Sequence, residues 1–356
     1  MSSNPTPLVS IIVPCYNTAR YVGEALDSAL AQTYSQCEIV AIDDGSTDES
    51  AAILDRYAAQ HPTRFTAIHQ ANQGLGRTRM NGIAVARGDF IVSLDADDRL
   101  HPDAVATWIA YQQAHPEFSV VYSFWQRIDA DGTLTGVHDY RLYRPGEPLE
   151  GHILPTMLVS SVVAATSLID KAALLAVGGY TSEALTRIAI QQIGNDRLRI
   201  EDYFLYLRLL LAGYAFGFVP QALFDYRDTP DSMSKNHKAM HMDQKVVLSA
   251  LIDEHREAMM EGWFIGHQQR EAHLGATWQA NQDAIRVLNE RVAQLEAALI
   301  VKENELNALR LENTNYQTEF TELAQQLRAM LAMVSPPPRA DAPGTISRKR
   351  SRKATL

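Results

Sequence analysis

Residues 90–98 read FIVSLDADD, an apolar run that ends in three carboxylates within four positions. The apolar part has the composition of a short strand buried on both faces. In an extended backbone Asp95 and Asp97 project to the same side. Such carboxylates repel one another unless a cation lies between them, and Mg²⁺ or Mn²⁺ bind one or two carboxylates together with substrate phosphates. The stretch predicts a metal–diphosphate site or, as an alternative, an acidic turn that caps the next helix.

Three more apolar segments precede this stretch, and each is followed by a polar turn and a helical pattern. They predict strands at residues 8–13, 38–42 and 65–69. Such alternation favours an α/β fold with a mostly parallel, Rossmann-like sheet flanked by helices, in which ligands bind beyond the carboxyl ends of the strands. The glycines at 74–76 do not complete a dinucleotide fingerprint, because position 79 is Arg79. Later strands are predicted at 120–124 and 162–169.

The composition limits the class of protein. The chain has 356 residues, a net charge of −10 and two cysteines. The negative charge argues against nucleic-acid binding, and so few cysteines favour a reducing compartment. The polar N-terminus lacks the apolar core of a secretion signal, and the sequence has no run of about 18 apolar residues. We therefore expect a soluble, cytoplasmic protein.

Four motifs together resemble glycosyltransferase family 2. They are VSIIVPCYN at 9–17, DDGSTD at 43–48, Arg79 shortly before Gly82-Ile83, and LDADD at 94–98. The resemblance covers residues 8–235. It implies a GT-A fold and the transfer of a sugar from a nucleotide-sugar, expected to be UDP-linked, with inversion and with Mn²⁺ or Mg²⁺.

The same resemblance implies roles for individual residues. Those assigned to the donor are Pro14, Tyr16, Asn17, Asp43, Asp44, Arg79, Asp95, Ala96 and Arg227, and those assigned to the metal are Asp95, Asp97 and Asp98. Asp44 is favoured over Asp43 for the uracil N3–H. The alternatives are an ordinary turn at residues 16–17, a solvated helix face at Arg79 and a polar surface loop at Arg227. The family often has Asn directly after this Arg, where this chain has Met80.

A second acidic motif begins the stretch IEDYFLYLRLLLAGY at 200–214, whose apolar spacing predicts a helix ended by Gly213. Carboxylates in a first turn are favoured by the helix dipole alone. The family pattern instead implies that Asp202, or less favoured Glu201, is the general base that deprotonates the acceptor hydroxyl. Residues 187–199 form a longer insertion than the family usually has.

Beyond residue 274 the apolar residues recur in alternating steps of three and four. One heptad position holds Trp278, Ile285, Val292, Leu299 and Leu306, and the other holds Leu274, Asn281, Leu288, Leu295, Lys302 and Leu309. This pattern predicts a dimeric or trimeric coiled coil, or alternatively one amphipathic helix folded onto the catalytic domain. The basic run at 348–353 either contacts an anionic membrane, at the inner face of the cell membrane, or only aids solubility.

These patterns divide the chain into four parts. We expect a glycosyltransferase domain at 1–235, with a nucleotide-binding half at 8–115 and an acceptor half at 116–235. A helical connector at 236–273, a coiled coil at 274–334 and a disordered basic tail at 335–356 follow. The expected acceptor is a glycan or a lipid-linked sugar in cell-surface polysaccharide assembly. The alternative function is a catalytically silent, sugar-nucleotide-binding head on a coiled-coil scaffold.

Overall fold

The computed structural model describes residues 6–138, 148–159, 161–195, 197–229, 232, 235–309, 325–326 and 328–329. The chain divides into unit 1, Met1–His273, and unit 2, Leu274–Leu356. The strands are β1 (Val9–Cys15), β2 (Cys37–Asp43), β3 (Phe65–His69), β4 (Phe90–Ser93), β5 (Arg99–Leu100), β6 (Phe118–Ile128), β7 (Leu134–His138), β8 (Leu168–Asp170) and β9 (Ala215–Arg227). The helices are α1 (Val22–Leu30), α2 (Ser50–Gln60), α3 (Leu75–Val85), α4 (Ala104–Ala114), α6 (Leu154–Val159), α7 (Lys171–Ala176), α8 (Glu183–Ile193), α9 (Glu201–Leu211) and α10 (His237–Leu309).

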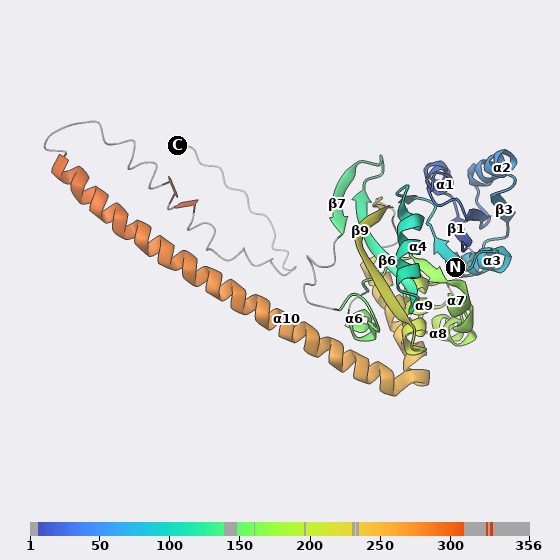
Figure 1. Ribbon diagram of the computed structural model, residues 1–356. Coiled ribbons are helices and arrows are strands. Elements are labelled where there is room, and N and C mark those ends of the chain that lie inside the picture. The colour runs from blue at the N-terminus through green and yellow to red at the C-terminus, as the bar shows by residue number, and fades with distance from the viewer. Residues whose placement is uncertain are drawn as a thin grey trace, which may run out of the picture. The chain divides into compact units, whose positions relative to one another are not determined.

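The described strands of unit 1 form one sheet in the order β3-β2-β1-β4-β8-β6-β9-β5, with β7 paired to β6. The first four are parallel, as predicted, and their register places Cys15 beside Asp43 and Ile12 beside Ser93. The prediction of a mostly parallel sheet is wrong for the whole molecule, because β8 runs antiparallel to both β4 and β6. The sheet is mixed, and β8 occupies only the last part of the strand predicted at 162–169. Figure 1 shows β6 beside its neighbours β7 and β9.

Both faces of the sheet are buried, which explains why its strands are almost continuously apolar. Alternate side chains enter opposite cores, since Ile11 packs with α1 and α4 whereas Ile12 packs with α3 and α9. The carboxyl ends of β1, β2 and β4 therefore meet at one edge, held between two packed layers of helices. This edge is where the polar motifs lie.

The predicted connector at 236–273 contributes to the core of unit 1. Val246, Val247, Leu251 and Met259 are buried there. The helix α10 has one non-helical backbone position, His255, with φ −133° and ψ 34°. None of the helices in the described residues is both long and apolar enough to cross a bilayer.

In unit 2 the described residues continue α10 as far as Leu309. Most of the later heptads, up to residue 334, and the basic tail at 335–356 lie outside the described residues. The coiled coil therefore stays a prediction.

Candidate active site

The loops after β1 and β2 are joined to each other by Asn17. Its backbone N–H donates to Ser46 Oγ at 3.0 Å, and its side-chain oxygen accepts from the Thr47 backbone N–H at 2.8 Å. Asn17 has a φ of +52°, a conformation that Asn adopts more readily than most residues. Pro14 is buried within β1, whereas the ring of Tyr16 is 50% exposed at the mouth of this edge. The aromatic face of Tyr16 is thus open to a ligand.

The two carboxylates that end β2 have different surroundings, although both are buried. Asp44 Oδ1 accepts from the Gln73 N–H at 2.8 Å and from the side chain of Gln70, and its Oδ2 accepts from the Gly74 N–H at 2.9 Å. Asp43 Oδ1 accepts from the Ser46 N–H, and its Oδ2 lies 3.5 Å from the ring of His69. Asp44 therefore organises the loop before α3, and Asp43 keeps more hydrogen-bonding capacity of its own.

Arg79 is the centre of the site and is only 1% exposed, so it is not on a solvated helix face. Its guanidinium forms ion pairs with Glu201 and with Asp95, the latter at 2.5 Å, and its Nε donates to Ser93 Oγ at 2.8 Å. A buried guanidinium needs such partners, because a charge removed from water is otherwise very costly. Arg79 thus connects the acidic motif after β4 to the acidic motif that begins α9.

Two of the three carboxylates after β4 are harder to ionise than a carboxylate in water. Asp95 is partly exposed, as is Asp97, whereas Asp98 is only 3% exposed. Burial, together with the charge of Asp95, raises the pKa of Asp97 to about 6. Burial and the charges of both neighbours raise the pKa of Asp98 well above its ordinary value. Carboxylates that repel one another when ionised are therefore concentrated at this point of the sheet edge.

This concentration of carboxylates is the observation that fits a divalent cation. The described residues contain no cluster of three or more His, Cys, Asp or Glu side chains that would hold a metal by itself. Mg²⁺ and Mn²⁺ do not need one, since one or two carboxylates and substrate phosphates are their usual ligands. Asp97 and the second oxygen of Asp95 are the oxygens suited to that role. Ala96, between them, is buried.

Arg227 lies behind the acidic motif, with its side chain fully buried. Its guanidinium donates to the Asp97 carbonyl oxygen at 2.8 Å and to Glu24 at 2.7 Å, and its backbone N–H donates to Asp98 Oδ1 at 2.8 Å. The prediction that Arg227 reaches the donor phosphates does not match this position, because tertiary contacts in the interior already use its donors. As placed, it holds Asp98 and the backbone of the motif.

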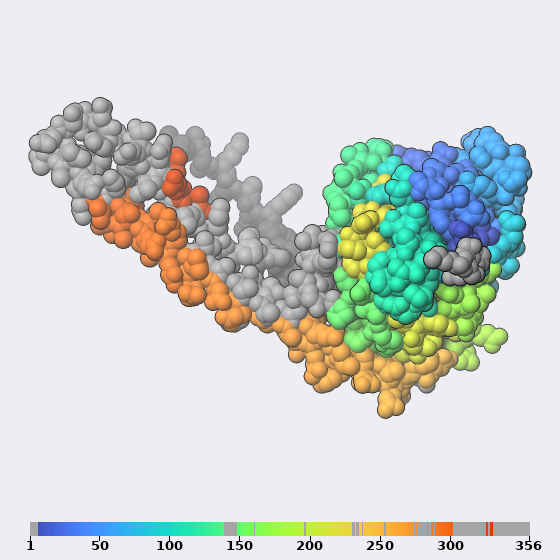
Figure 2. Space-filling model, viewed as in Figure 1, coloured from blue at the N-terminus to red at the C-terminus, as the bar shows by residue number. Residues whose placement is uncertain are grey.

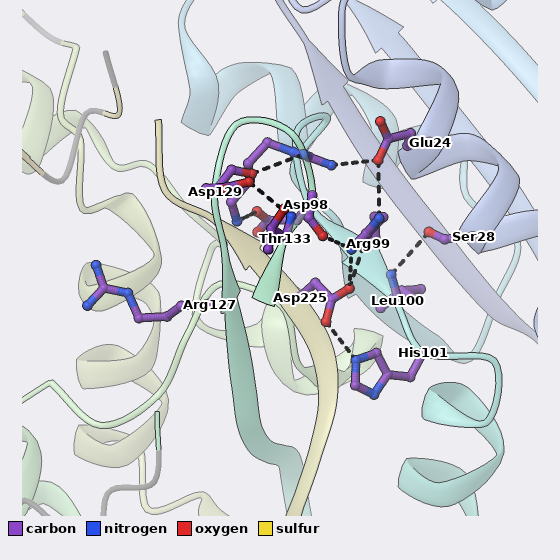
Figure 3. A network of polar contacts seen from close by, with 12 residues as sticks. Glu24, Ser28, Asp98, Arg99, Leu100, His101, Arg127, Asp129, Thr133 and Asp225 are labelled. Carbon is purple, nitrogen blue, oxygen red and sulfur yellow. Dashed lines mark hydrogen bonds and ion pairs between the residues drawn. The ribbon is translucent and has the colours of Figure 1, made fainter. Parts of the chain in front are cut away.

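The same network continues to the far edge of the sheet (Figure 3). Arg99 bonds to Asp225 at 2.8 Å, and the ring of His101 contacts the other oxygen of Asp225 at 2.8 Å. Glu24, from α1, lies between Arg99 and Arg227. These ion pairs and hydrogen bonds connect β5 and β9 to the acidic motif.

The acidic pair at the start of α9 is divided between two environments. Glu201 is buried and paired with Arg79, whereas Asp202 is partly exposed, and its Oδ1 accepts from the Tyr203 N–H at 2.8 Å. Burial raises the pKa of Asp202, and the charge of Arg79 offsets only part of that effect. Of the two, Asp202 is therefore the carboxylate available to a substrate.

Sequence reasoning missed several residues that complete the site. Tyr180 is fully buried, and the Arg79 guanidinium lies 5.4 Å from its ring centroid. Ser93 and Gln70 position Arg79 and Asp44. The sequence offers a signal for Tyr180 alone, since Gly178-Gly179-Tyr180 resembles a Gly-Gly-aromatic turn of glycosyltransferase family 2. The insertion at 187–199 is partly α8, which borders a hollow of about 720 Å³ lined by Arg77, Thr181, Thr186 and Arg187 among others.

Comparisons with known proteins agree with this geometry. Residues 10–174 match the family model Glycosyl transferase family 2. The chain is 39% identical over 128 residues to a chondroitin synthase of Escherichia coli, covering 36% of this chain and 18% of that protein. It is 47% identical over 98 residues to a putative glycosyltransferase, EpsH, of Bacillus subtilis, covering 28% of each. The matches thus span well under half the length of these relatives.

Two solved structures show the same fold. One is S. aureus TarS 1–349 in complex with UDP-GlcNAc, with a TM-score of 0.54 at 17% identity, covering 73% of this chain and 72% of that one. The other is the mannosyltransferase PcManGT of Pyrobaculum calidifontis in complex with GDP-Man and Mn²⁺, with a TM-score of 0.54 at 17% identity, covering 92% and 87%. The GT-A-like fold expected from the sequence is confirmed. Residues 10–174 of this chain are similar to the glycosyl transferase family 2 domain.

Proposed function

We propose that the chain transfers a sugar from a nucleotide-sugar, UDP-linked, to a hydroxyl of a glycan or lipid-linked acceptor, with inversion and with Mn²⁺ or Mg²⁺. The observation that carries the proposal is the convergence on Arg79 of two acidic motifs that are far apart in the sequence. One motif offers oxygens for a cation and the other offers a carboxylate of raised pKa. Inverting transfer needs both kinds of group in one site.

The donor would lie along the carboxyl ends of β1, β2 and β4. The open ring of Tyr16 would stack against the base, and Asp43 or Asp44 would accept the uracil N3–H. Because Asp44 already accepts three hydrogen bonds within the chain, Asp43 is the better placed of the two. Asp95 and Asp97 would hold the metal, which supplies positive charge for the leaving nucleoside diphosphate.

Asp202 is proposed as the general base. The acceptor oxygen attacks the anomeric carbon and Asp202 takes its proton, while the bond to the diphosphate breaks and the nucleoside diphosphate leaves with the electron pair. The raised pKa of Asp202 suits this task, because a base works best when its pKa is closer to the working pH. Glu201 would act indirectly, by holding Arg79.

Further proposals concern the rest of the chain. Chondroitin synthase is among the relatives of the domain, which supports a role in polysaccharide assembly. Residues 274–334 would pair as a coiled coil, and the basic run at 348–353 would contact anionic lipid at the inner membrane face.

A binding and turnover experiment tests the proposed function. We expect UDP with Mn²⁺ to raise the melting temperature of the wild type, and Asp97→Ala to remove the dependence on Mn²⁺. Asp202→Asn should bind UDP normally yet lose at least about 100-fold in UDP release from UDP-sugars. Glu49→Gln, an exposed carboxylate away from these contacts, is the matched control. Wild type that binds UDP but releases none from any donor would favour the catalytically silent head.

A further inference from the structure

The α10 helix packs one of its faces against α6 within unit 1. A Cβ added at Gly262 would lie 2.9 Å from Leu158 Cδ1, and one added at Gly266 would overlap the Pro155 carbonyl group. Met259, on the same face, is only 4% exposed. The helices approach this closely because the two glycines carry no side chain. In Figure 2 the light-orange surface of this segment lies along the green and yellow surface of unit 1.

Outside this packed face, the same helical segment is apolar and exposed. Met260 is 58% exposed, Trp263 48% and Phe264 58%, and the ring of His267 lies 4.1 Å from that of Trp263. At 3.6 residues per turn, Phe264 points about 160° away from Gly262 and also from Gly266. Large apolar side chains gathered in this way usually mark an interaction site.

The exposed face keeps the heptad register of unit 2, with Glu271 at the one a position between Phe264 and Trp278. Counting back two heptads from Trp278 gives Phe264, and counting back from Asn281 gives Met260 and His267. Gly262 and Gly266 then fall at outer heptad positions, which face away from a partner helix. The outer heptad positions of this segment therefore pack on unit 1. The core heptad positions are left free for a partner helix.

We propose that a second copy of this chain docks on the face formed by Met260, Trp263, Phe264 and His267, as a parallel, in-register pair that begins inside unit 1. Every copy presents the same face in the same register, which suits a two-fold symmetric contact. The contact goes beyond the sugar-transfer function, and it extends the proposed coiled coil at 274–334.

The charges beside this face agree with a parallel register. Residues at g positions meet residues five places later, at e positions, on the partner helix. Arg256 then faces Glu261 of the partner subunit, and Arg291 faces Glu296 of the partner subunit. All four side chains are exposed in the single chain. Glu257 and Glu271 occupy a positions at the two ends of the apolar face and would limit the contact to the residues between them.

Cysteine cross-linking of the full-length chain tests this proposal. The native Cys15 and Cys37 are buried, so an added thiol reports with little background. We expect Phe264→Cys to form a disulfide-linked dimer under mild oxidation, because a positions of a parallel pair face each other. Ala258→Cys, exposed but off the stripe, should remain at least tenfold less cross-linked. Leu288→Cys tests the coiled coil of unit 2 by itself.

The results at the two positions distinguish docking within unit 1 from pairing in unit 2. Cross-linking at both residues 264 and 288 supports the proposal. Cross-linking at 288 alone keeps the coiled coil but overturns docking within unit 1, and cross-linking at neither overturns both. Met260→Lys with Phe264→Lys provides an independent measurement, since it should raise the dimer dissociation constant at least tenfold in sedimentation equilibrium. An unchanged constant would contradict the proposal, whatever the sugar-transfer activity.

Discussion

At the scale of single residues, the site depends on Arg79. Its two carboxylate partners are 16 and 122 positions away along the chain, and the guanidinium is buried between them. Such a charge contributes to stability, and in the proposed site it would orient Asp95 beside the cation and hold Glu201 in an ion pair.

Arg79→Ala should therefore be strongly destabilising. It leaves the buried Glu201 and the partly exposed Asp95 without a countercharge, and breaking a buried ion pair from one side costs about 3–5 kcal/mol. Urea denaturation would measure the free energy of unfolding. Arg56→Ala, which removes an exposed arginine of α2, should change it by no more than about 0.5 kcal/mol. A loss below about 1 kcal/mol for Arg79→Ala would mean that the carboxylates become protonated or solvated.

At the scale of elements, two connections hold the site together. The turn at 178–180 brings Tyr180 under Arg79, and it has positive φ at both glycines. The pairing of β5 with β9 brings Asp225 to Arg99 and His101. Neither connection contains a proposed catalytic residue. Each holds a backbone segment next to the proposed site.

Gly179→Ala should destabilise the turn for two separable reasons. The backbone has a φ of +73°, which costs an L-residue about 1–2 kcal/mol, and the new Cβ would overlap the thioether of Met80. Adding Met80→Ala should remove the overlap but leave the backbone cost. A double-mutant cycle measured by thermal denaturation separates these contributions. Gly136→Ala, which meets no neighbour and has no positive φ, serves as the control.

Asp225→Asn should destabilise the chain in a pH-dependent way. Burial opposes the charged form, but the His101 contact and the Arg99 guanidinium outweigh it, so the pKa of Asp225 is below its ordinary value. A lowered folded-state pKa contributes stability that is present above the unfolded value of about 3.9 and lost as the pH falls through the folded value.

The difference in unfolding free energy between wild type and Asp225→Asn should therefore be about 1–3 kcal/mol at pH 7 and should shrink below about pH 4. Denaturation curves at pH 7, 5 and 3 would measure it. A difference that is constant with pH would show that the Asp225 charge is not the origin of the effect.

At the scale of the whole molecule, the site and the predicted pairing helix belong to separate parts of the chain. The described residues of the site all lie in unit 1, whereas most of the heptads lie in unit 2. Self-association and sugar transfer should therefore be separable by mutation.

Leu288→Pro should weaken self-association while leaving the site intact. A proline in a helix interior costs about 3 kcal/mol and would interrupt the heptads at a d position. Light scattering after size exclusion should show a smaller particle than the wild type, while UDP binding per chain stays the same. Leu288→Met, which keeps the heptad, should leave the particle size unchanged. A loss of UDP binding with Leu288→Pro would show that the two units depend on each other.

The parallel core and the edge that carries its polar turns are predictable from the sequence alone. Apolar runs that alternate with helical patterns dictate parallel strands, and turn residues after β1, β2 and β4 must then share one edge. The positions of Tyr16, Asp43, Asp95 and Asp97 follow from that local pattern. Their roles stay predictions.

Only the tertiary structure decided which polar side chains are available to a ligand. The sequence is compatible with Arg79 and Arg227 either in a site or on the surface. In the structure both are buried. Arg79 pairs with Glu201, and Arg227 donates to the backbone carbonyl of Asp97. The short β8 runs antiparallel to β4 and β6, and both of these strands are distant from it in the sequence. Local spacing encodes the direction of a side chain from its own strand or helix, but its partners come from segments that only folding brings together.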